Sequence, residues 1–262
     1  MESKTLETLL IDAADNGVVT VTMNRPAKKN AANATMWEEL RTTWSEIALD
    51  PSVRCVVMTG AGDAFCSGAD LGGGGEREMH QLQSMNMIHM TVKALYQIMV
   101  PVVAKVNGVA AGAGMNMALA CDLIVAGDQA RFSEIFARRG LTVDFGGTWI
   151  LPRLVGLHKA KELAFFGDVI SAADAERFGI VNRLVPQDEL DAFVDDWADR
   201  LAAGPPLALS MTKRLLTQNA TADFAAALEA EGMAQTVNFA TSDTREAVKA
   251  FMEKRDPEFH GR

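Results

Sequence analysis

The sequence predicts an α/β fold with a helical C-terminal region. Over the first two-thirds of the chain, short apolar runs alternate with amphipathic stretches, a pattern that favours a layered core of strands and helices. Residues 53–59 (VRCVVMT) form a continuous apolar run that is typical of a buried parallel strand. Beyond residue 186, helical patterns follow one another without a further strand. We therefore expect an α/β core over residues 1–200 and a helical region over residues 201–262.

The N-terminal half predicts a hairpin followed by strand–helix repeats. Apolar runs at 6–11 and 18–23 flank Asp15-Asn16-Gly17, and Asn-Gly between two such runs is a strong hairpin signal. Asn33 can cap a helix that ends near Leu49. The elements expected next are a strand at 53–59, a glycine-rich loop at 60–75, a helix at about 76–99, a strand at 102–106, a helix at about 113–120 and a strand at 123–126.

The C-terminal part predicts helices that are separated by proline, glycine and aspartate. Two short helices are expected at 158–166 and 171–178, and a last strand follows at 180–185. Four amphipathic helices are expected after that strand, at 188–203, 206–218, 223–239 and 244–255.

The composition excludes several classes of partner. The 262 residues carry a formal net charge of −9, which argues against nucleic acids and anionic membranes as main partners. No apolar stretch approaches the ~20 residues that a membrane span needs, and the first twelve residues lack the apolar run of a secretory signal. The three cysteines cannot all pair with one another, so we expect reduced thiols in a cytoplasmic protein.

The sequence favours neither a metal centre nor a nicotinamide cofactor. The four histidines are dispersed without metal-ligand spacing, so we expect no metal. Gly108, Gly112 and Gly114 follow a predicted strand, as glycines do in nicotinamide-binding folds, but here they lie in mid-chain. Tyr96 is the only tyrosine, and no lysine lies four residues after it to form a proton-transfer pair.

Two glycine-rich segments each follow a predicted buried strand. They span residues 60–71 and 106–116, and their small side chains leave backbone N–H groups uncovered. The second segment ends at a predicted helix start, where free N–H groups and the helix dipole favour negative charge. Two such N–H groups that converge would form an oxyanion hole. Close packing of a strand against a helix also selects glycine and alanine, and spacing alone leaves both interpretations open.

A series of motifs, spread in order over nearly the whole chain, points to one family. The motifs are Asn24-Arg25-Pro26, Asn30-Ala31, Phe65 to Leu71 (FCSGADL), Val106-Asn107-Gly108 through Cys121-Asp122, Gly146-Gly147-Thr148-Trp149, and Leu151 to Gly156 (LPRLVG). Together they resemble the enoyl-CoA hydratase/isomerase (crotonase) superfamily. The resemblance implies a spiral of ββα units with a C-terminal helical trimerisation region, and a homotrimer or a hexamer built as a dimer of trimers.

The resemblance implies roles for the two glycine-rich segments. The N–H groups of Ala69 and Ala113 would form the oxyanion hole for the thioester carbonyl of an acyl-CoA substrate. The enolate formed by proton loss next to that carbonyl is the charged species that they would stabilise. CoA is part of the substrate, so no separate cofactor is implied. The residues implied to line the CoA site in the first segment are Ser67, Gly68, Ala69, Asp70 and Leu71.

The phosphates of CoA need a local basic patch in this acidic chain. Arg25 and Lys28 lie just after the second predicted strand, where the family binds the CoA nucleotide. Lys254 in the tail is a further candidate, contributed by a neighbouring subunit. An ordinary solvated basic cluster is the alternative for each of these residues.

The chain departs from the pattern of typical hydratases in the family, which use two glutamates. Gap-free alignment puts Asn116 at the first glutamate position and Phe136 at the second. Neither side chain can act as a general acid or base. Hydration by the usual pair is therefore not expected.

Asp144 offers a different chemistry. Its position resembles that of the single acid/base in some isomerases of the family, where one carboxylate is sufficient to move a proton between two carbons. An apolar setting provided by Phe136, Phe145 and Trp149 would raise its pKa. The alternative is that Asp144 caps the helix that begins near Phe145. Glu134, a second carboxylate close in sequence, is a further candidate, with a helix-surface position or a supporting contact as the alternative.

Three functions remain open at this point. The leading hypothesis is an isomerase that moves the double bond of an enoyl-CoA from position 3 to position 2, with Asp144 as acid/base. The second is a hydratase that recruits Asp144 or Glu134 for the addition of water to a 2-enoyl-CoA. The third is a non-catalytic protein that binds acyl-CoA.

Overall fold

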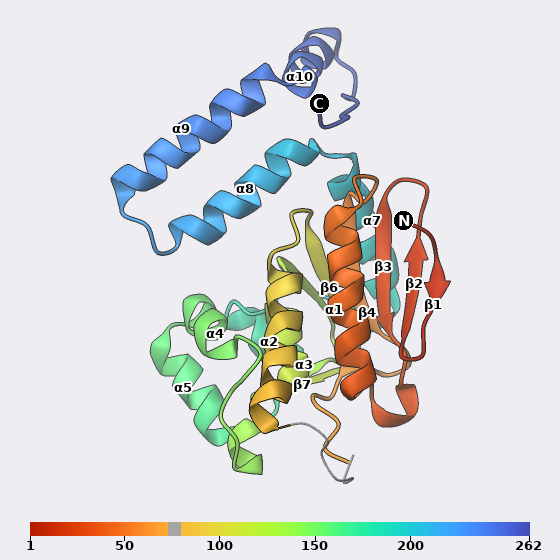
Figure 1. Ribbon diagram of the computed structural model, residues 1–262, viewed down its shortest axis with the longest axis vertical. Coiled ribbons are helices and arrows are strands. Elements are labelled where there is room, and N and C mark those ends of the chain that lie inside the picture. Colours follow the sequence, from red (N-terminus) through yellow and green to blue (C-terminus); the bar gives the residue numbers. More distant parts are fainter. Residues whose placement is uncertain (73–79) are drawn as a thin grey trace.

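The computed structural model describes residues 1–72 and 80–262, and it consists of two sheets covered by helices (Figure 1). Within these residues, the larger sheet has seven strands in the order β1-β2-β3-β4-β6-β8-β11, and the smaller has four in the order β10-β9-β7-β5. The strands are β1 (Lys4–Thr5), β2 (Leu9–Ala13), β3 (Val18–Met23), β4 (Cys55–Gly60), β5 (Ala64–Cys66), β6 (Val102–Val106), β7 (Val109–Ala111), β8 (Leu123–Gly127), β9 (Arg131–Ser133), β10 (Ile170–Ser171) and β11 (Arg183–Val185).

The predicted hairpin is confirmed as β2 and β3, which pair antiparallel. Gly17 in its turn has a φ of +87°, which glycine adopts without strain. The apolar run at 6–11 becomes a shorter strand than predicted. Leu6 N–H donates to Leu9 O (2.9 Å) and turns the chain, so that Lys4–Thr5 pairs back on β2. From β3 onward, neighbouring strands of the larger sheet are parallel. All six residues of β4 are buried, as its apolar run predicts.

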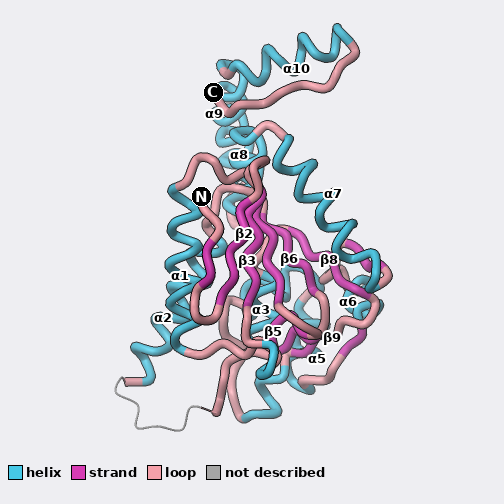
Figure 2. The backbone as a smooth tube through the Cα atoms, turned by 90° about the vertical axis from the view of Figure 1, so that its right-hand side faces the viewer, coloured by secondary structure: helices cyan, strands magenta, loops and turns pink. Residues whose placement is uncertain are grey.

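Helices cover both faces of the larger sheet (Figure 2). α1 (Ala34–Leu49) and α2 (Gln81–Tyr96) pack side by side on one face, and Asn33 caps α1 by accepting a backbone N–H at 3.0 Å, as predicted. α7 (Leu190–Ala203) packs on the other face, against buried valines of the sheet. The end of the predicted glycine-rich loop and the start of the helix predicted after it fall at 73–79, outside the described residues.

The smaller sheet is absent from the sequence predictions, because strands of two or three residues carry no periodic pattern. β5 and β7 are parallel neighbours in it. α3 (Ala113–Leu119), whose residues are all buried, follows β7 almost directly. Repeated strand–strand–helix units of this kind agree with the spiral of ββα units that the resemblance implies.

Short helices complete the body of the molecule. The sequence analysis predicts α5 and α6, and the helix that it expects to begin near Phe145 is α4, which begins at Gly147. These elements are η1 (Pro26–Lys28), η2 (Ile135–Arg139), α4 (Gly147–Val155), α5 (Leu157–Phe166), α6 (Ala172–Arg177) and η3 (Gln187–Glu189).

The last three helices form an arm that extends away from the body (Figure 1). The arm comprises α8 (Pro206–Asn219), α9 (Phe224–Ala240) and α10 (Ser242–Glu253), and α8 and α9 contain no buried residue. α9 exposes large apolar side chains, with Leu228 50% and Phe239 65% accessible. Along the chain as described, no helix is both long and apolar enough to cross a membrane.

Candidate active site

The two alanines whose amides are predicted to form an oxyanion hole follow neighbouring parallel strands. Ala69 lies three residues after the end of β5, and Ala113 lies two residues after the end of β7. Gly68 shows how close the two segments are, because a Cβ built on it would lie 3.8 Å from the Ala113 nitrogen and 2.9 Å from the Ala111 oxygen. Gly68 also has a φ of +104°. The chain therefore needs glycine there for both its conformation and its close approach.

The backbone around both amides is fixed, while their N–H groups donate no hydrogen bond within the described residues. Ala32 pairs with the first segment on either side of Ala69, since its N–H donates to Gly68 O (2.8 Å) and its oxygen accepts from Asp70 N–H (2.9 Å). Ala113 is the first residue of α3, a position where the N–H has no acceptor within the helix. Within residues 1–72 and 80–262, neither amide is recorded as donating to another group.

Close packing, the alternative explanation for the small residues, accounts for some of them. A Cβ on Gly108 would lie 2.0 Å from Asp63 O, and a Cβ on Gly114 would lie 2.1 Å from Cys66 O. These two glycines are required by the approach of β5 to the segment around α3. The uncovered amide of Ala113 is not explained in this way, so the two interpretations apply to different residues.

The residues predicted to line the CoA site in the first segment lie against the loop that follows β3. Arg25 pairs with Asp70 (2.9 Å), and its guanidinium also donates to Ala31 O. Ser67 N–H donates to Lys29 O (3.0 Å), beside the exposed side chain of Lys28. Arg25 is therefore engaged within the fold. Of the two basic residues predicted here, Lys28 is the one whose side chain is exposed and available to bind a phosphate.

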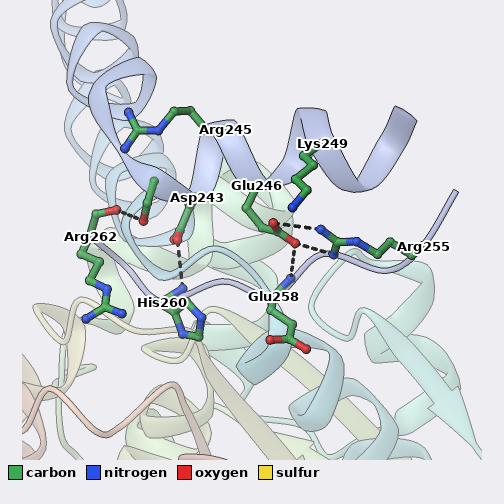
Figure 3. Close-up of a pocket in the computed structure, with 9 residues that line it drawn as sticks. Asp243, Arg245, Glu246, Lys249, Arg255, Glu258, His260 and Arg262 are labelled. Carbon is green, nitrogen blue, oxygen red and sulfur yellow. Dashed lines mark hydrogen bonds and ion pairs between the residues drawn. The ribbon is translucent and has the colours of Figure 1, made fainter. Parts of the chain in front are cut away.

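The fold of one chain does not bring Lys254 to this place. Lys254 ends α10 in the arm, whereas α3 and β7 lie in the body (Figure 1). The tail after α10 folds back on that helix, where Arg255 donates to Glu246 (3.0 Å) and the His260 N–H donates to Asp243 (2.9 Å), as Figure 3 shows. The exposed Lys254 side chain can meet a CoA molecule bound at Ala69 through a neighbouring copy, and this role stays a prediction.

Asp144 is tied directly to α3. The Asn116 side chain, one turn after Ala113 on that helix, donates from Nδ2 to the backbone oxygen of Asp144 (2.9 Å). The carboxyl atom Oδ1 of Asp144 is buried and has no hydrogen-bond partner in the described part of the chain. Burial raises the pKa of Asp144 to about 6, and the charge of His89 opposes that rise. The result is a partly desolvated carboxyl group on a residue whose main chain is tied to α3.

The suggestion that Asp144 caps the next helix is wrong. Gly146 is the N-cap of α4, with a φ of +81°, and no side chain caps it. Phe145 also has a positive φ of 50°, which is strained for a residue with a bulky side chain. Its ring is fully buried against Trp37, with 5.5 Å between centroids. The turn that presents Asp144 is therefore held by aromatic packing rather than by a cap.

The apolar setting predicted around Asp144 is present in part. Phe136 and Phe145 are buried, whereas Trp149 is 37% exposed and lies under the guanidinium of Arg153. The two phenylalanines agree with the desolvation of the Asp144 carboxyl group. Trp149 is instead at the surface of α4.

Glu134 lies in the interior, so the expectation of a helix-surface position is wrong. Its residue is 1% exposed, its Oε2 accepts from Asn116 Nδ2 (3.4 Å), and its Oε1 has no partner in the described part of the chain. Burial, with a smaller contribution from the charge of Asp144, raises the pKa of Glu134 to about 8. Asn116 thus contacts both carboxyl-bearing residues. The sequence signal for this role was a polar residue in a helix of otherwise small or apolar ones.

Outside 73–79, no group of three or more His, Cys, Asp or Glu side chains could hold a metal ion. Cys55, Cys66 and Cys121 are all buried and free, as expected for reduced thiols.

Comparison with known proteins places this chain in one family. The family model described as enoyl-CoA hydratase/isomerase matches residues 13–262. This chain belongs to the enoyl-CoA hydratase/isomerase family.

The relatives include proteins with different activities in their names. A protein of Rhodobacter capsulatus named "Probable enoyl-CoA hydratase" is 38% identical over 247 residues, which cover 94% of this chain and 95% of that protein. The 1,2-epoxyphenylacetyl-CoA isomerase of Escherichia coli (strain K12) is 34% identical over 261 residues, covering 97% and 98%. The crystal structure of enoyl-CoA hydratase from Bacillus anthracis matches with a TM-score of 0.93 at 32% identity, covering 98% of this chain and 100% of that chain.

Proposed function

We propose that this protein is an acyl-CoA isomerase that moves a carbon–carbon double bond, with Asp144 as its acid/base. One observation carries the proposal: Asn116 ties Asp144 to α3, three residues from the uncovered amide of Ala113. Asn116 thereby ties the main chain of the proposed base to the helix whose first amide would stabilise the anion. Proton transfer next to a thioester needs both groups together.

The proposed reaction uses one carboxyl group twice. The Asp144 carboxylate takes a proton from C2 of a 3-enoyl-CoA, and the electron pair moves into the thioester. The N–H groups of Ala69 and Ala113 donate to the resulting enolate oxygen. The protonated Asp144 then returns its proton to C4, so that the double bond ends between C2 and C3. No atom is gained or lost.

The raised pKa of Asp144 suits this role. With a pKa of about 6, the group is ionised at neutral pH and can act as a base, while it binds a proton more tightly than an ordinary aspartate. Activity should therefore fall as the pH drops through about 6, because protonation of Asp144 removes the base.

Hydration of a 2-enoyl-CoA is the second candidate function. It is favoured by the hydratase names of several relatives and by the presence of a second buried carboxyl group, that of Glu134. The positions implied for the usual glutamates hold Asn116 and Phe136 instead. A hydratase would therefore have to use Asp144 and Glu134 in their place.

Two substrates separate these functions from each other and from acyl-CoA binding without catalysis. The purified protein is incubated with 3-hexenoyl-CoA and with 2-hexenoyl-CoA, and absorbance of the conjugated thioester is followed. A gain of absorbance from the first substrate supports the isomerase. Loss of absorbance from the second without isomerisation of the first would replace it by a hydratase. Binding of both without turnover would leave a non-catalytic acyl-CoA protein.

We also propose that the arm assembles this chain into a homotrimer or a dimer of trimers. The support is the exposed apolar surface of α9, which a single chain leaves uncovered. In such an assembly Lys254 would reach the CoA phosphates of a neighbouring copy, next to Lys28. Sedimentation at several protein concentrations tests this, and a particle of 28.2 kDa throughout would contradict it.

A further inference from the structure

Three buried polar atoms beside α3 lack hydrogen-bond partners. In the part of the chain that the structure describes, they are Asn116 Oδ1, Glu134 Oε1 and Asp144 Oδ1. Buried polar groups without partners are rare and costly, so a cluster of three calls for a physical cause. The Asp144 atom belongs to the proposed base. The other two sit on side chains that already contact each other.

Both amide hydrogens of Asn116 have acceptors, but its amide oxygen has no donor among the described residues. Its amide nitrogen carries two hydrogens and has two acceptors, Asp144 O at 2.9 Å and Glu134 Oε2 at 3.4 Å. Its amide oxygen can only accept, and no donor reaches it. An ionised Glu134 has no hydrogen to donate, so both orphan atoms would then be hydrogen-bond acceptors without a donor.

A protonated Glu134 supplies the missing hydrogen. A carboxylic acid and a primary amide are complementary, because the acid O–H donates to the amide oxygen while the amide N–H donates to the acid carbonyl. A hydrogen on Glu134 Oε1 that is donated to Asn116 Oδ1 would pair both orphan atoms. The second amide hydrogen of Asn116 remains on the Asp144 main chain.

The surrounding charges favour the protonated form. Burial acts most strongly and raises the pKa of the Glu134 carboxyl group. The hydrogen bond from Asn116 opposes this rise, and the nearby charge of Asp144 adds to it. The nearest arginine on η2, Arg138, donates to Phe166 O and pairs with Asp168 at the surface. On α5, which packs against η2, Lys159 pairs with Glu162.

A titratable group on α2, His89, acts on the other carboxyl group. His89 is exposed, and its charge lowers the pKa of Asp144. The pKa of Glu134 therefore lies above that of Asp144, which favours the negative charge on Asp144.

We propose that Glu134 is a positioning residue that works as a neutral acid: its pairing with Asn116 fixes the main chain of Asp144 against α3. This inference rests on the proposed function of Asp144 as the base. It implies that Glu134 itself exchanges no proton with the substrate. Ionisation of Glu134 would break the acid–amide pair and place a second negative charge near the position where the enolate forms.

Two substitutions at residue 134 test the proposal. Glu134→Gln keeps an amide donor in place of the acid O–H and should retain kcat for 3-hexenoyl-CoA within about threefold at pH 7. Glu134→Ala leaves Asn116 unpaired, and the loss of positioning should lower kcat by about 10- to 100-fold. Wild-type activity should decline above a pH of about 8, and the Gln variant should lose that decline.

A pair of variants tests whether the two residues act as one unit. Asn116→Ala should lower kcat about as much as Glu134→Ala, and the double variant should lose little more than either. Circular dichroism and melting temperatures verify that each variant folds. Additive losses in the double variant would overturn the pairing, as would a Glu134→Ala variant with the kcat and pH profile of the wild type.

Infrared difference spectra keep this test separate from the proposed function. At pH 7 the wild-type protein should show a protonated-carboxyl band that Glu134→Gln removes, and that a control Glu229→Gln on the exposed face of α9 retains. If the band is found but 3-hexenoyl-CoA is not isomerised, the proposed function fails while the neutral state of Glu134 stands. If the band is missing, or if Glu134→Gln is as inactive as Asp144→Asn, the proposal for Glu134 is wrong.

Discussion

The body and the arm of this molecule are incomplete in opposite ways. Beside α3, buried oxygen atoms of Asn116, Glu134 and Asp144 lack partners among residues 1–72 and 80–262. On α9, which contains no buried residue, apolar side chains such as Leu228 and Phe239 are exposed. The cluster beside α3 therefore needs a polar ligand or a proton, whereas α9 needs an apolar surface to pack against.

This difference indicates how the two regions contribute to function. Every group proposed for the chemistry comes from the body of one chain, where Asn116 joins α3 to Asp144 and Glu134. The arm contributes the tail residue Lys254, which the fold holds away from its own chain's amide pair. The body is therefore expected to govern the rate of proton transfer, and the arm to govern assembly and CoA binding.

The largest expected effect separates catalysis from stability within the body. Asp144→Asn removes the base and should lower kcat/KM for 3-hexenoyl-CoA by about 10²- to 10⁴-fold. The melting temperature should not fall, because the substitution replaces a carboxyl group whose buried Oδ1 has no partner in the described residues by a neutral side chain of the same shape. Steady-state kinetics and calorimetry measure the two effects. Retention of full activity would refute the assignment of Asp144.

A slightly smaller effect is expected from deleting one backbone donor. Ala113→Pro removes the N–H at the first position of α3, where proline is compatible with a helix. The loss of one oxyanion donor should lower kcat by about 10²- to 10³-fold. Ala113→Gly, which retains the N–H, is the matched control and should keep most of the activity. Equal losses in both variants would show that packing at this position matters and the hydrogen bond does not.

The sequence is informative about the long elements and poor on the short ones. The capped helix α1 and the continuous apolar strand β4 are predictable because local signals determine them. β5 and β7 have three residues each, and pairing between distant segments, rather than a local pattern, makes them strands. The smaller sheet, which brings Ala69 and Ala113 together, therefore follows from the resemblance and not from periodicity.

The site shows the same division. The resemblance indicates Asp144, but its hydrogen bond with Asn116 joins residues 28 positions apart through a strained turn at Phe145. Glu134 immediately precedes a short helix that carries Arg138 and Arg139, yet its side chain is buried. Its burial depends on packing that no local pattern encodes.

The next prediction tests the arm. Leu228→Asp together with Phe239→Asp would bury charges in the proposed contact between copies, at a cost of more than about 3 kcal/mol. Sedimentation should then give a particle of 28.2 kDa in place of a multiple of that mass. KM for the CoA substrate should rise more than kcat falls, because Lys254 of a neighbour is lost. Glu229→Gln on the same helix is the control for surface substitution.

The smallest effect concerns the stability of the body as a function of pH. The pKa of Glu134 is about 8 in the folded protein and near 4.5 in an unfolded chain. Between these values the unfolded chain binds fewer protons, so the contribution of Glu134 to stability decreases as the pH rises. The contribution is fully present below about pH 4.5 and is lost by about pH 8.

Glu134→Gln cannot lose a proton and should escape this decrease. The difference in unfolding free energy between the variant and the wild type should therefore grow by a few kcal/mol between pH 5 and pH 8, or by several degrees in melting temperature. Taking the difference cancels the titration of all other groups, including those of the arm. A constant difference over this range would mean that the folded state does not raise the pKa of Glu134. The proposal that Glu134 is a neutral acid paired with Asn116 would then be wrong.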